Sequence, residues 1–167
     1  MRKFDNEKRK SFIKRLSDLP SLDDVNNDLT IRCKFNFSYF DSSQNAGQDF
    51  KDWTDKQLYE LLEKLKDFSR NQLDYWRHQR VGGGGLKRFV IYGAFPNKSE
   101  FVHPKHIPHQ VQWGRFRLDQ KIRLIGFTIH AEFHNNLHSK TQEYFDKNTF
   151  YVVFLDRDHK FYITEDE

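Results

Sequence analysis

The stretch FYVVFL, Phe150–Leu155, constrains the fold most, because all six of its residues are apolar or aromatic. Successive side chains of a β-strand point to opposite faces of a sheet, so a run of this kind is buried on both faces. It is far too short to span a membrane. We therefore expect Thr149–Leu155 to be a central strand, and a chain of 167 residues is long enough for one domain built around it.

Strand and helix signals precede this run. Apolar side chains alternate with polar ones over residues 29–40, which predicts a strand with one buried face. Thr54 followed three residues later by Gln57 is a capping-box signal for the start of a helix. A second helix is predicted over residues 73–80, and the glycines of residues 81–85 predict a flexible turn.

The second half of the chain reads as a run of strands. Strands are predicted over residues 87–93, 112–118 and 121–133, with a tight turn at Asp119–Gln120, and a short edge strand over residues 159–163. This order predicts an α+β fold in which helices pack on one face of an antiparallel sheet.

The ends and insertions of this domain also follow from the pattern. An amphipathic helix over residues 5–19 belongs to a predicted N-terminal helical extension, residues 1–28. Residues 29–167 are predicted to form the single α+β domain, with insertions at about 82–110 and 134–148.

Positive charge is concentrated in one part of the chain. The formal net charge is +4, and eight Lys/Arg residues lie between Leu86 and Arg123, opposed only by Glu100 and Asp119. A polyanion such as RNA would bind such a region in preference to the rest. We expect its basic side chains to contact RNA, including Lys87, Arg88 and Lys121.

The predicted compartment is the cytoplasm. Cys33 is the single cysteine, so no internal disulfide can form. The basic N-terminus is not followed by the apolar core of a secretion signal, and no apolar stretch is long enough for a membrane helix.

Three arginines mark the predicted strand pair at residues 112–133. Arg115 and Arg117 are two residues apart and therefore share one face of a strand, and Arg123 lies across the turn. Like charges on one sheet face repel each other unless an anion neutralises them, and planar guanidinium groups suit phosphate. The alternative is neutralisation by acids of the chain itself, namely Asp119, Glu132 or residues 165–167.

The sequence DRDH, Asp156–His159, follows the central strand directly. In a meander this charged end lies near the arginines. A neutral imidazole at His159 can take a proton from a hydroxyl group, and Arg157 beside it can stabilise charge on a phosphoryl group. The 2′-hydroxyl of RNA can serve as the nucleophile, so this chemistry needs neither a metal nor another cofactor. The alternative is a solvated turn between strands.

The series QWGRFRLDQKIRLIGFTI and TFYVVFLDRDHKFY resembles the C-terminal half of RelE/ParE-superfamily toxins. RelE-type members are metal-independent endoribonucleases that cut mRNA, commonly on the ribosome, and an acidic antitoxin holds them inactive. The resemblance implies that Arg115 and Arg117 hold the RNA backbone and that Arg123 stabilises the scissile phosphate. It implies that His159 acts with Arg157 at the end of the central strand. Tyr162 resembles the late aromatic residue that stacks on or positions the substrate.

The chain departs from this family in two ways. It is much longer than most members, and Asp156 and Asp158 place acids where the family favours positive charge. ParE-type members share the fold but poison DNA gyrase without cutting RNA, so a non-catalytic module that binds nucleic acid or protein is the alternative function.

Two histidine series complete the candidates. His103, His106 and His109 are three apart between prolines, a spacing that aligns side chains in a polyproline helix. They could bind zinc, contact phosphate or RNA, or lie in an exposed loop. His130, His134 and His138 are four apart and would share a face only if the segment were helical. No metal site is predicted from either series.

Overall fold

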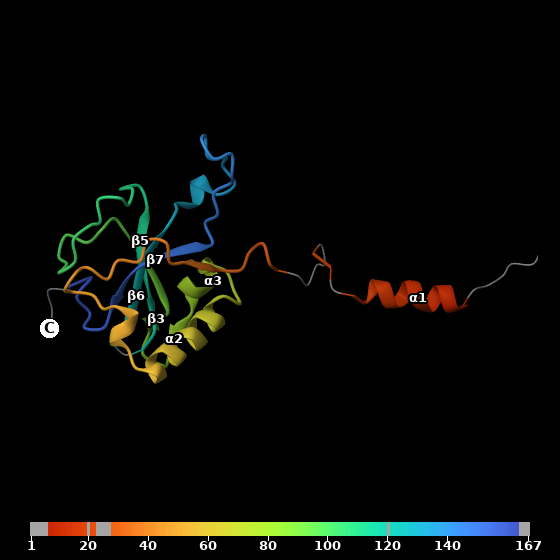
Figure 1. The fold of residues 1–167 in the computed structure, drawn as a ribbon, viewed down its shortest axis with the longest axis horizontal. Helices are drawn as coiled ribbons and strands as arrows, with labels where there is room; N and C mark the ends of the chain where they lie inside the picture. The colour runs from red at the N-terminus through yellow and green to blue at the C-terminus, as the bar shows by residue number, and fades with distance from the viewer. Residues whose placement is uncertain (1–6, 20, 23–27, 120, 164–167) are drawn as a thin grey trace, which may run out of the picture. The chain divides into compact units, whose positions relative to one another are not determined.

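The computed structural model describes residues 7–19, 21–22, 28–119 and 121–163 (Figure 1). The chain forms two compact units, residues 1–31 and residues 32–167. The first unit holds helix α1 (Glu7–Ser17), none of whose residues is buried. The remaining residues of the predicted N-terminal extension, 1–6, 20 and 23–27, lie outside the described residues.

The second unit is built on a five-stranded sheet with the strand order β1-β7-β6-β5-β4. The strands are β1 (Lys34–Asn36), β4 (Phe89–Gly93), β5 (Gln112–Arg117), β6 (Arg123–Thr128) and β7 (Thr149–Asp156). Strands β4 to β7 form an antiparallel meander, and β1 pairs in parallel with β7. The α+β class is thus confirmed, and β7 is flanked on both sides as its apolar run predicts, but the sheet is mixed rather than wholly antiparallel.

The predicted strand over residues 29–40 is mostly wrong, because only Lys34–Asn36 pairs. The side chain of Asn36 accepts a hydrogen bond from the backbone N–H of Ser38 at 2.9 Å, and Phe40 N–H donates to Phe37 O at 3.0 Å. These bonds form a turn that interrupts pairing with β7, which the chain meets again where Asp41 N–H donates to Val153 O at 2.8 Å.

Helices α2 (Asp55–Phe68) and α3 (Leu73–His78) lie together on one face of the sheet, after the short 3₁₀ helix η1 (Phe50–Asp52) (Figure 1). The predicted capping box is confirmed: Thr54 Oγ1 accepts from Gln57 N–H at 3.3 Å, and Gln57 Oε1 accepts from Thr54 N–H at 2.9 Å. Buried residues of both helices pack with sheet residues in one core: Leu61, Phe68, Leu73, Trp76, Phe89, Phe116, Leu124 and Phe150.

The other face of the sheet is covered by the chain segment between β4 and β5, residues 94–111. Phe101 and Ile107 of this segment are buried against Trp113 and Phe154 of the sheet and Phe161 of the C-terminal segment. The predicted insertion therefore contains a packed layer. Burial on both faces explains why β7 is continuously apolar.

Short elements complete the unit. Strands β2 (Arg80–Val81) and β3 (Leu86–Lys87) form a hairpin around the predicted glycine turn, and η2 (Ala131–Phe133) follows β6. Among the described residues, no helix has the length and apolar character needed to cross a membrane.

Candidate functional site

The β5–β6 hairpin gathers the arginines at one end of the sheet. Arg117 pairs with Arg123, and Arg123 pairs with Asp156 of β7, so these three residues lie side by side across three strands. Arg115 precedes Arg117 by two residues and shares its face. Phe116 points to the helix side, where it is fully buried.

Burial and mutual repulsion act on these arginines. Arg117 is 8 % exposed and Arg123 is 3 % exposed. Burial first, and then Arg117 and Arg115, lower the pKa of Arg123 to about 10, while Tyr92 and Asp156 oppose this shift. Burial and Arg115 also lower the pKa of Arg117. The hairpin end is therefore a partly desolvated site of positive potential.

The guanidinium groups differ in what they contact. Arg123 Nη1 donates to the backbone carbonyl oxygens of Asp119 at 2.9 Å and Ile122 at 3.0 Å, and so fixes the turn of its own hairpin. Arg115 Nε donates to the hydroxyl oxygen of Tyr92 at 2.9 Å. Arg115 Nη1 is buried and makes no hydrogen bond to the described residues. Arg115 therefore retains an unsatisfied donor, which neighbouring atoms cover in this structure.

Tyr92 belongs to the site but carries no sequence signal of its own that marks it as functional. The register of β4 against β5 shifts between Ile91 and Gly93, so Tyr92 is the extra residue of a β-bulge. Bulges re-aim side chains, and this one turns the phenol toward Arg115. Gly93, the next residue, has a φ of +88°. A glycine at the end of a strand pattern is a sequence feature that can indicate such a bulge.

The turn after β7 is shaped by Asp156, which is 1 % exposed. Its Oδ1 accepts from Lys160 N–H at 2.9 Å and its Oδ2 accepts from Phe161 N–H at 3.0 Å. His159 lies within this turn with a φ of +62°. The edge strand predicted over residues 159–163 is consequently wrong, because these two N–H groups are used by the Asp156 carboxylate instead of a neighbouring strand.

The same turn brings His159 and Tyr162 to the arginines. Burial and Arg123 lower the pKa of His159, Asp156 opposes the shift, and Arg115 and Arg117 add to it. The Tyr162 ring stacks on the Tyr92 ring, with centroids 4.6 Å apart and planes 6° apart. His159 and Tyr162 are both exposed at the surface of the cluster.

The structure thus brings five predicted residues together with Tyr92 and Asp156: Arg115, Arg117, Arg123, His159 and Tyr162. We call these seven residues the arginine cluster. The opposing acids suggested by the sequence are placed differently. Asp119 is exposed, Glu132 lies 3.4 Å from His130 Nδ1, and residues 165–167 lie outside the described residues.

The other predicted site residues have separate positions. Lys87 and Lys121 are exposed, on β3 and on the β5–β6 turn. Arg88 is half-buried between β3 and β4, where its backbone oxygen accepts from Arg117 N–H at 2.8 Å. Arg157 is exposed, with its Nε 3.8 Å from Asp158 Oδ1.

The histidine series are also rearranged. Turns closed by Ile107 N–H to Pro104 O and Val111 N–H to Pro108 O replace a polyproline helix. As a result the rings of His103 and His109 stack with centroids 4.5 Å apart, while His106 stacks on Tyr39. Within residues 7–19, 21–22, 28–119 and 121–163, no three His, Cys, Asp or Glu side chains are grouped as metal ligands.

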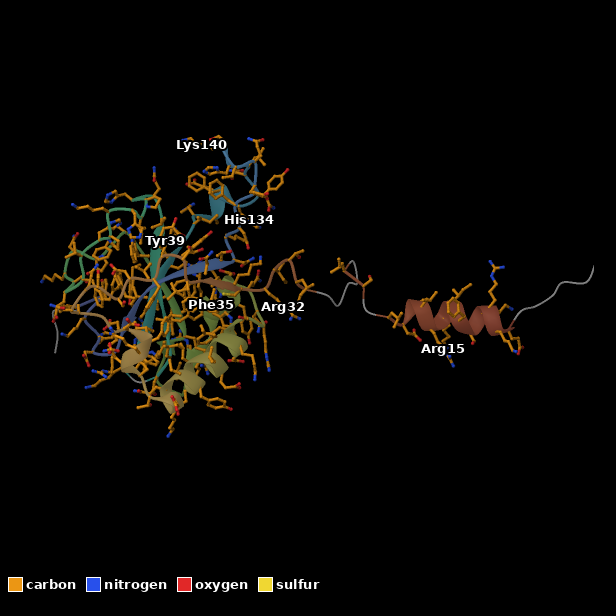
Figure 2. The ribbon with its side chains drawn as sticks, viewed as in Figure 1. Arg15, Arg32, Phe35, Tyr39, His134 and Lys140 are labelled. Atoms are coloured by element: carbon orange, nitrogen blue, oxygen red, sulfur yellow. The ribbon has the colours of Figure 1, made fainter. Side chains whose placement is uncertain are left out.

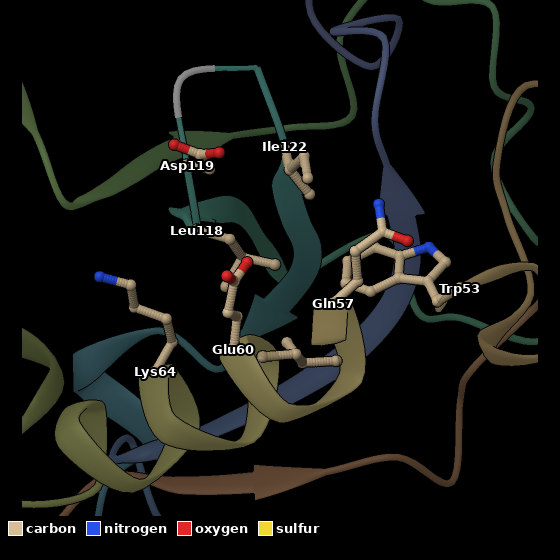
Figure 3. Close-up of a pocket in the computed structure, with 8 residues that line it drawn as sticks. Trp53, Gln57, Glu60, Lys64, Leu118, Asp119 and Ile122 are labelled. Carbon is tan, nitrogen blue, oxygen red and sulfur yellow. The ribbon is translucent and has the colours of Figure 1, made fainter. Parts of the chain in front are cut away.

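A pocket of about 300 Å³ lies on the helix side of the sheet, between α2 and the β5–β6 turn (Figure 3). Glu60 and Lys64 project from α2 toward Leu118 and Asp119, as Figure 3 shows. This pocket shares the turn with Arg123 but faces away from the arginine cluster, because Leu118 packs in the helix-side core.

No family model matches the chain, and neither a curated protein nor a solved structure matches it.

Proposed function

We propose that the protein is a RelE-like endoribonuclease that cuts RNA without a metal, by attack of the 2′-hydroxyl on the scissile phosphate. One observation carries this proposal: side chains from β4, β5, β6 and the turn after β7 meet in the arginine cluster, where three arginines act electrostatically on an exposed histidine. The RelE-like identity itself rests on the resemblance of sequence pattern and element order.

The chemistry assigns one role to each group. His159 has a lowered pKa and is therefore neutral near pH 7, which lets it accept the 2′-hydroxyl proton. The 2′ oxygen attacks phosphorus, the bond to the 5′ oxygen breaks, and the leaving oxygen takes a proton from solvent. The products are a 2′,3′-cyclic phosphate and a 5′-hydroxyl end.

The arginines and tyrosines support this step. Arg115 offers a guanidinium donor to the phosphate, while Arg117 and Arg123 supply positive potential from below the surface. Tyr162 presents an exposed ring beside the site, supported on its other side by Tyr92. Arg157, Lys87, Arg88 and Lys121 are proposed to contact the RNA backbone outside the arginine cluster. The ribosome and an acidic antitoxin are proposed partners that rest on the resemblance.

A second candidate function is a non-catalytic module of the same fold that binds nucleic acid or a protein target. The use of Arg123 Nη1 inside its own hairpin favours this candidate, because part of that guanidinium serves the fold.

Cleavage of a labelled single-stranded RNA in the presence of EDTA tests the proposal. His159→Ala is expected to lower the cleavage rate by about 10²- to 10⁴-fold, the contribution of a general base. Arg115→Ala is expected to lower it by about 10²-fold or more through the loss of phosphate stabilisation.

Matched controls are available on the helix side of the sheet. His78→Ala and Arg70→Ala change exposed residues of the same types outside the arginine cluster and leave the rate unchanged. If the protein binds RNA with a steep salt dependence but leaves it intact, the result would support the binding module and refute the nuclease. Equal rates for wild type, His159→Ala and Arg115→Ala would show that cleavage occurs elsewhere.

A further inference from the structure

A pocket of about 420 Å³ lies beyond the end of β5–β6 opposite to the arginine cluster. It is lined mainly by apolar and aromatic side chains, among them Tyr39, Val111, Ile129, Phe133, His138 and Phe145. A largely apolar cavity of this size with few polar groups is typical of a small-ligand site. Apart from Tyr39, its walls come from residues 94–111 and from the projecting segment after β6 that carries His134 and Lys140 (Figure 2).

Aromatic rings hold each other in place around this pocket. Tyr39 stands edge-on to Phe127 at 5.1 Å and to Tyr151 at 5.7 Å between centroids. The ring centroid of Phe145 lies 6.2 Å from that of Phe133 and 5.4 Å from that of His138. Phe133, His138 and Phe145 are not fully buried, so a planar ligand can reach their rings.

Tyr39, Gln110, His130 and His138 are the lining residues with polar side chains, and His138 has a defined hydrogen-bonding role. His138 Nδ1 accepts from the backbone N–H groups of Lys140 at 3.3 Å and Thr141 at 3.1 Å. Because these N–H groups can only donate, the proton of the neutral ring is on Nε2. His138 therefore offers one N–H donor, which suits a ring nitrogen or carbonyl acceptor of a heterocycle.

The pocket and the arginine cluster lie on the same side of the sheet. Val111, Trp113, Arg115 and Arg117 alternate onto one face of β5 and the residue before it, and Trp113 and Val111 pack in the core of that face. Val111 and Arg117 are six positions apart in sequence, which corresponds to about 20 Å of extended chain. A single strand of RNA several nucleotides long can span this distance.

We propose that this pocket binds a nucleobase of the RNA, several nucleotides from the phosphate held at the arginine cluster. Since the ligand is part of the RNA substrate, this inference rests on the proposed function. The aromatic walls provide stacking, which every base can use, and His138 reads an acceptor on the base edge. The pocket then contributes to the choice of cleavage site, and the arginine cluster performs the cut.

Binding of the four ribonucleosides to the full chain tests the pocket separately from cleavage. Adenosine, guanosine, cytidine and uridine carry no phosphate, so the arginine cluster does not attract them by charge. We expect at least one to bind in an NMR titration. Phe145→Ala and Phe133→Ala should each weaken that binding about 5- to 100-fold, the range for loss of one stacking partner.

Tyr144→Ala is the matched control, because Tyr144 precedes Phe145, is 69 % exposed and lies outside the pocket. It should leave nucleoside binding unchanged. Failure of all four nucleosides to bind, or equal binding by wild type and both folded phenylalanine variants, would overturn the inference. If the protein binds a nucleoside but leaves RNA intact, the nuclease proposal is refuted and the base-binding pocket is supported. If it cleaves RNA but binds no nucleoside, the nuclease proposal is supported and the base-binding pocket is refuted.

Discussion

Replacement of Asp156 by asparagine tests how the turn after β7 is built. The carboxylate accepts two backbone N–H bonds, at 2.9 Å and 3.0 Å, in a residue that is 1 % exposed. Asparagine keeps one oxygen acceptor but turns an NH₂ group toward the second N–H. One charge-assisted hydrogen bond is lost, at about 1.5–3 kcal/mol, and a buried donor is left unsatisfied, at about 1–3 kcal/mol. We therefore expect a loss of about 3 kcal/mol in the free energy of unfolding.

Urea denaturation followed by circular dichroism measures this loss. With a slope of about 2 kcal/mol per molar urea, the midpoint should fall by about 1.5 M. Asp158→Asn is the matched control, because Asp158 is exposed and its described ion pair with Arg157 is 3.8 Å long. Its free energy of unfolding should change by less than about 0.5 kcal/mol. Equal midpoints for the two variants would refute the role of Asp156 in ordering the turn.

The same variant has an electrostatic readout at His159. Asp156 raises the pKa of His159 against the lowering by burial and Arg123, so removing its charge should lower that pKa further. An NMR titration of the His159 ring measures the shift. A higher pKa in Asp156→Asn would contradict the placement of the imidazole between Asp156 and the arginines.

Two further predictions concern packing and pH. Gly126→Ala should cost about 3 kcal/mol or more and lower the melting temperature by about 6–12 °C, because the added Cβ would overlap Tyr151 O and approach the Phe150 ring to 2.9 Å. Gly83→Ala, where no atom lies within 4 Å of the added Cβ, is its control, and equal melting temperatures would contradict the overlap. The pKa of His159 lies below its ordinary 6.5 in the folded chain, so the unfolded chain binds that proton first as the pH falls. The contribution of His159 to the free energy of unfolding is therefore present above about pH 6.5 and is lost as the pH falls from 6.5 to the lower folded pKa. As the pH is lowered over this window, the urea midpoint of His159→Gln should fall less than that of wild type. An identical pH dependence in the two proteins would show that the His159 pKa is not shifted by folding.

The parts of the fold that could be predicted from sequence are those with local causes. The capping box at Thr54 and Gln57 marks the start of α2 through bonds between neighbours in sequence. The apolar run of β7 reports burial on both faces by itself. Alternation also places Arg115 and Arg117 on one face and Phe116 on the other.

The parts that could not be predicted depend on contacts between distant residues. Residues 94–111 are proline-broken and irregular in sequence, yet Phe101 and Ile107 are buried against one face of the sheet. Tyr92 enters the arginine cluster through a bulge, which depends on the register with β5. The shortness of β1 follows from an Asn36 side-chain bond that competes with strand pairing.

The burial of the arginines connects the stability of this end of the sheet with its chemistry. Arg117 and Arg123 are buried on the sheet face that also carries Trp113, Ile125 and Phe154. Apolar side chains at the two arginine positions would avoid the free-energy cost of desolvating charge. Burial and mutual repulsion lower the pKa of both arginines, so their charges work against folding. Burial and the same positive potential lower the pKa of His159. In the proposed mechanism the resulting neutral imidazole accepts a proton near pH 7. The charges that cost stability at the hairpin end therefore also help to keep neutral the imidazole that is proposed to act as the general base.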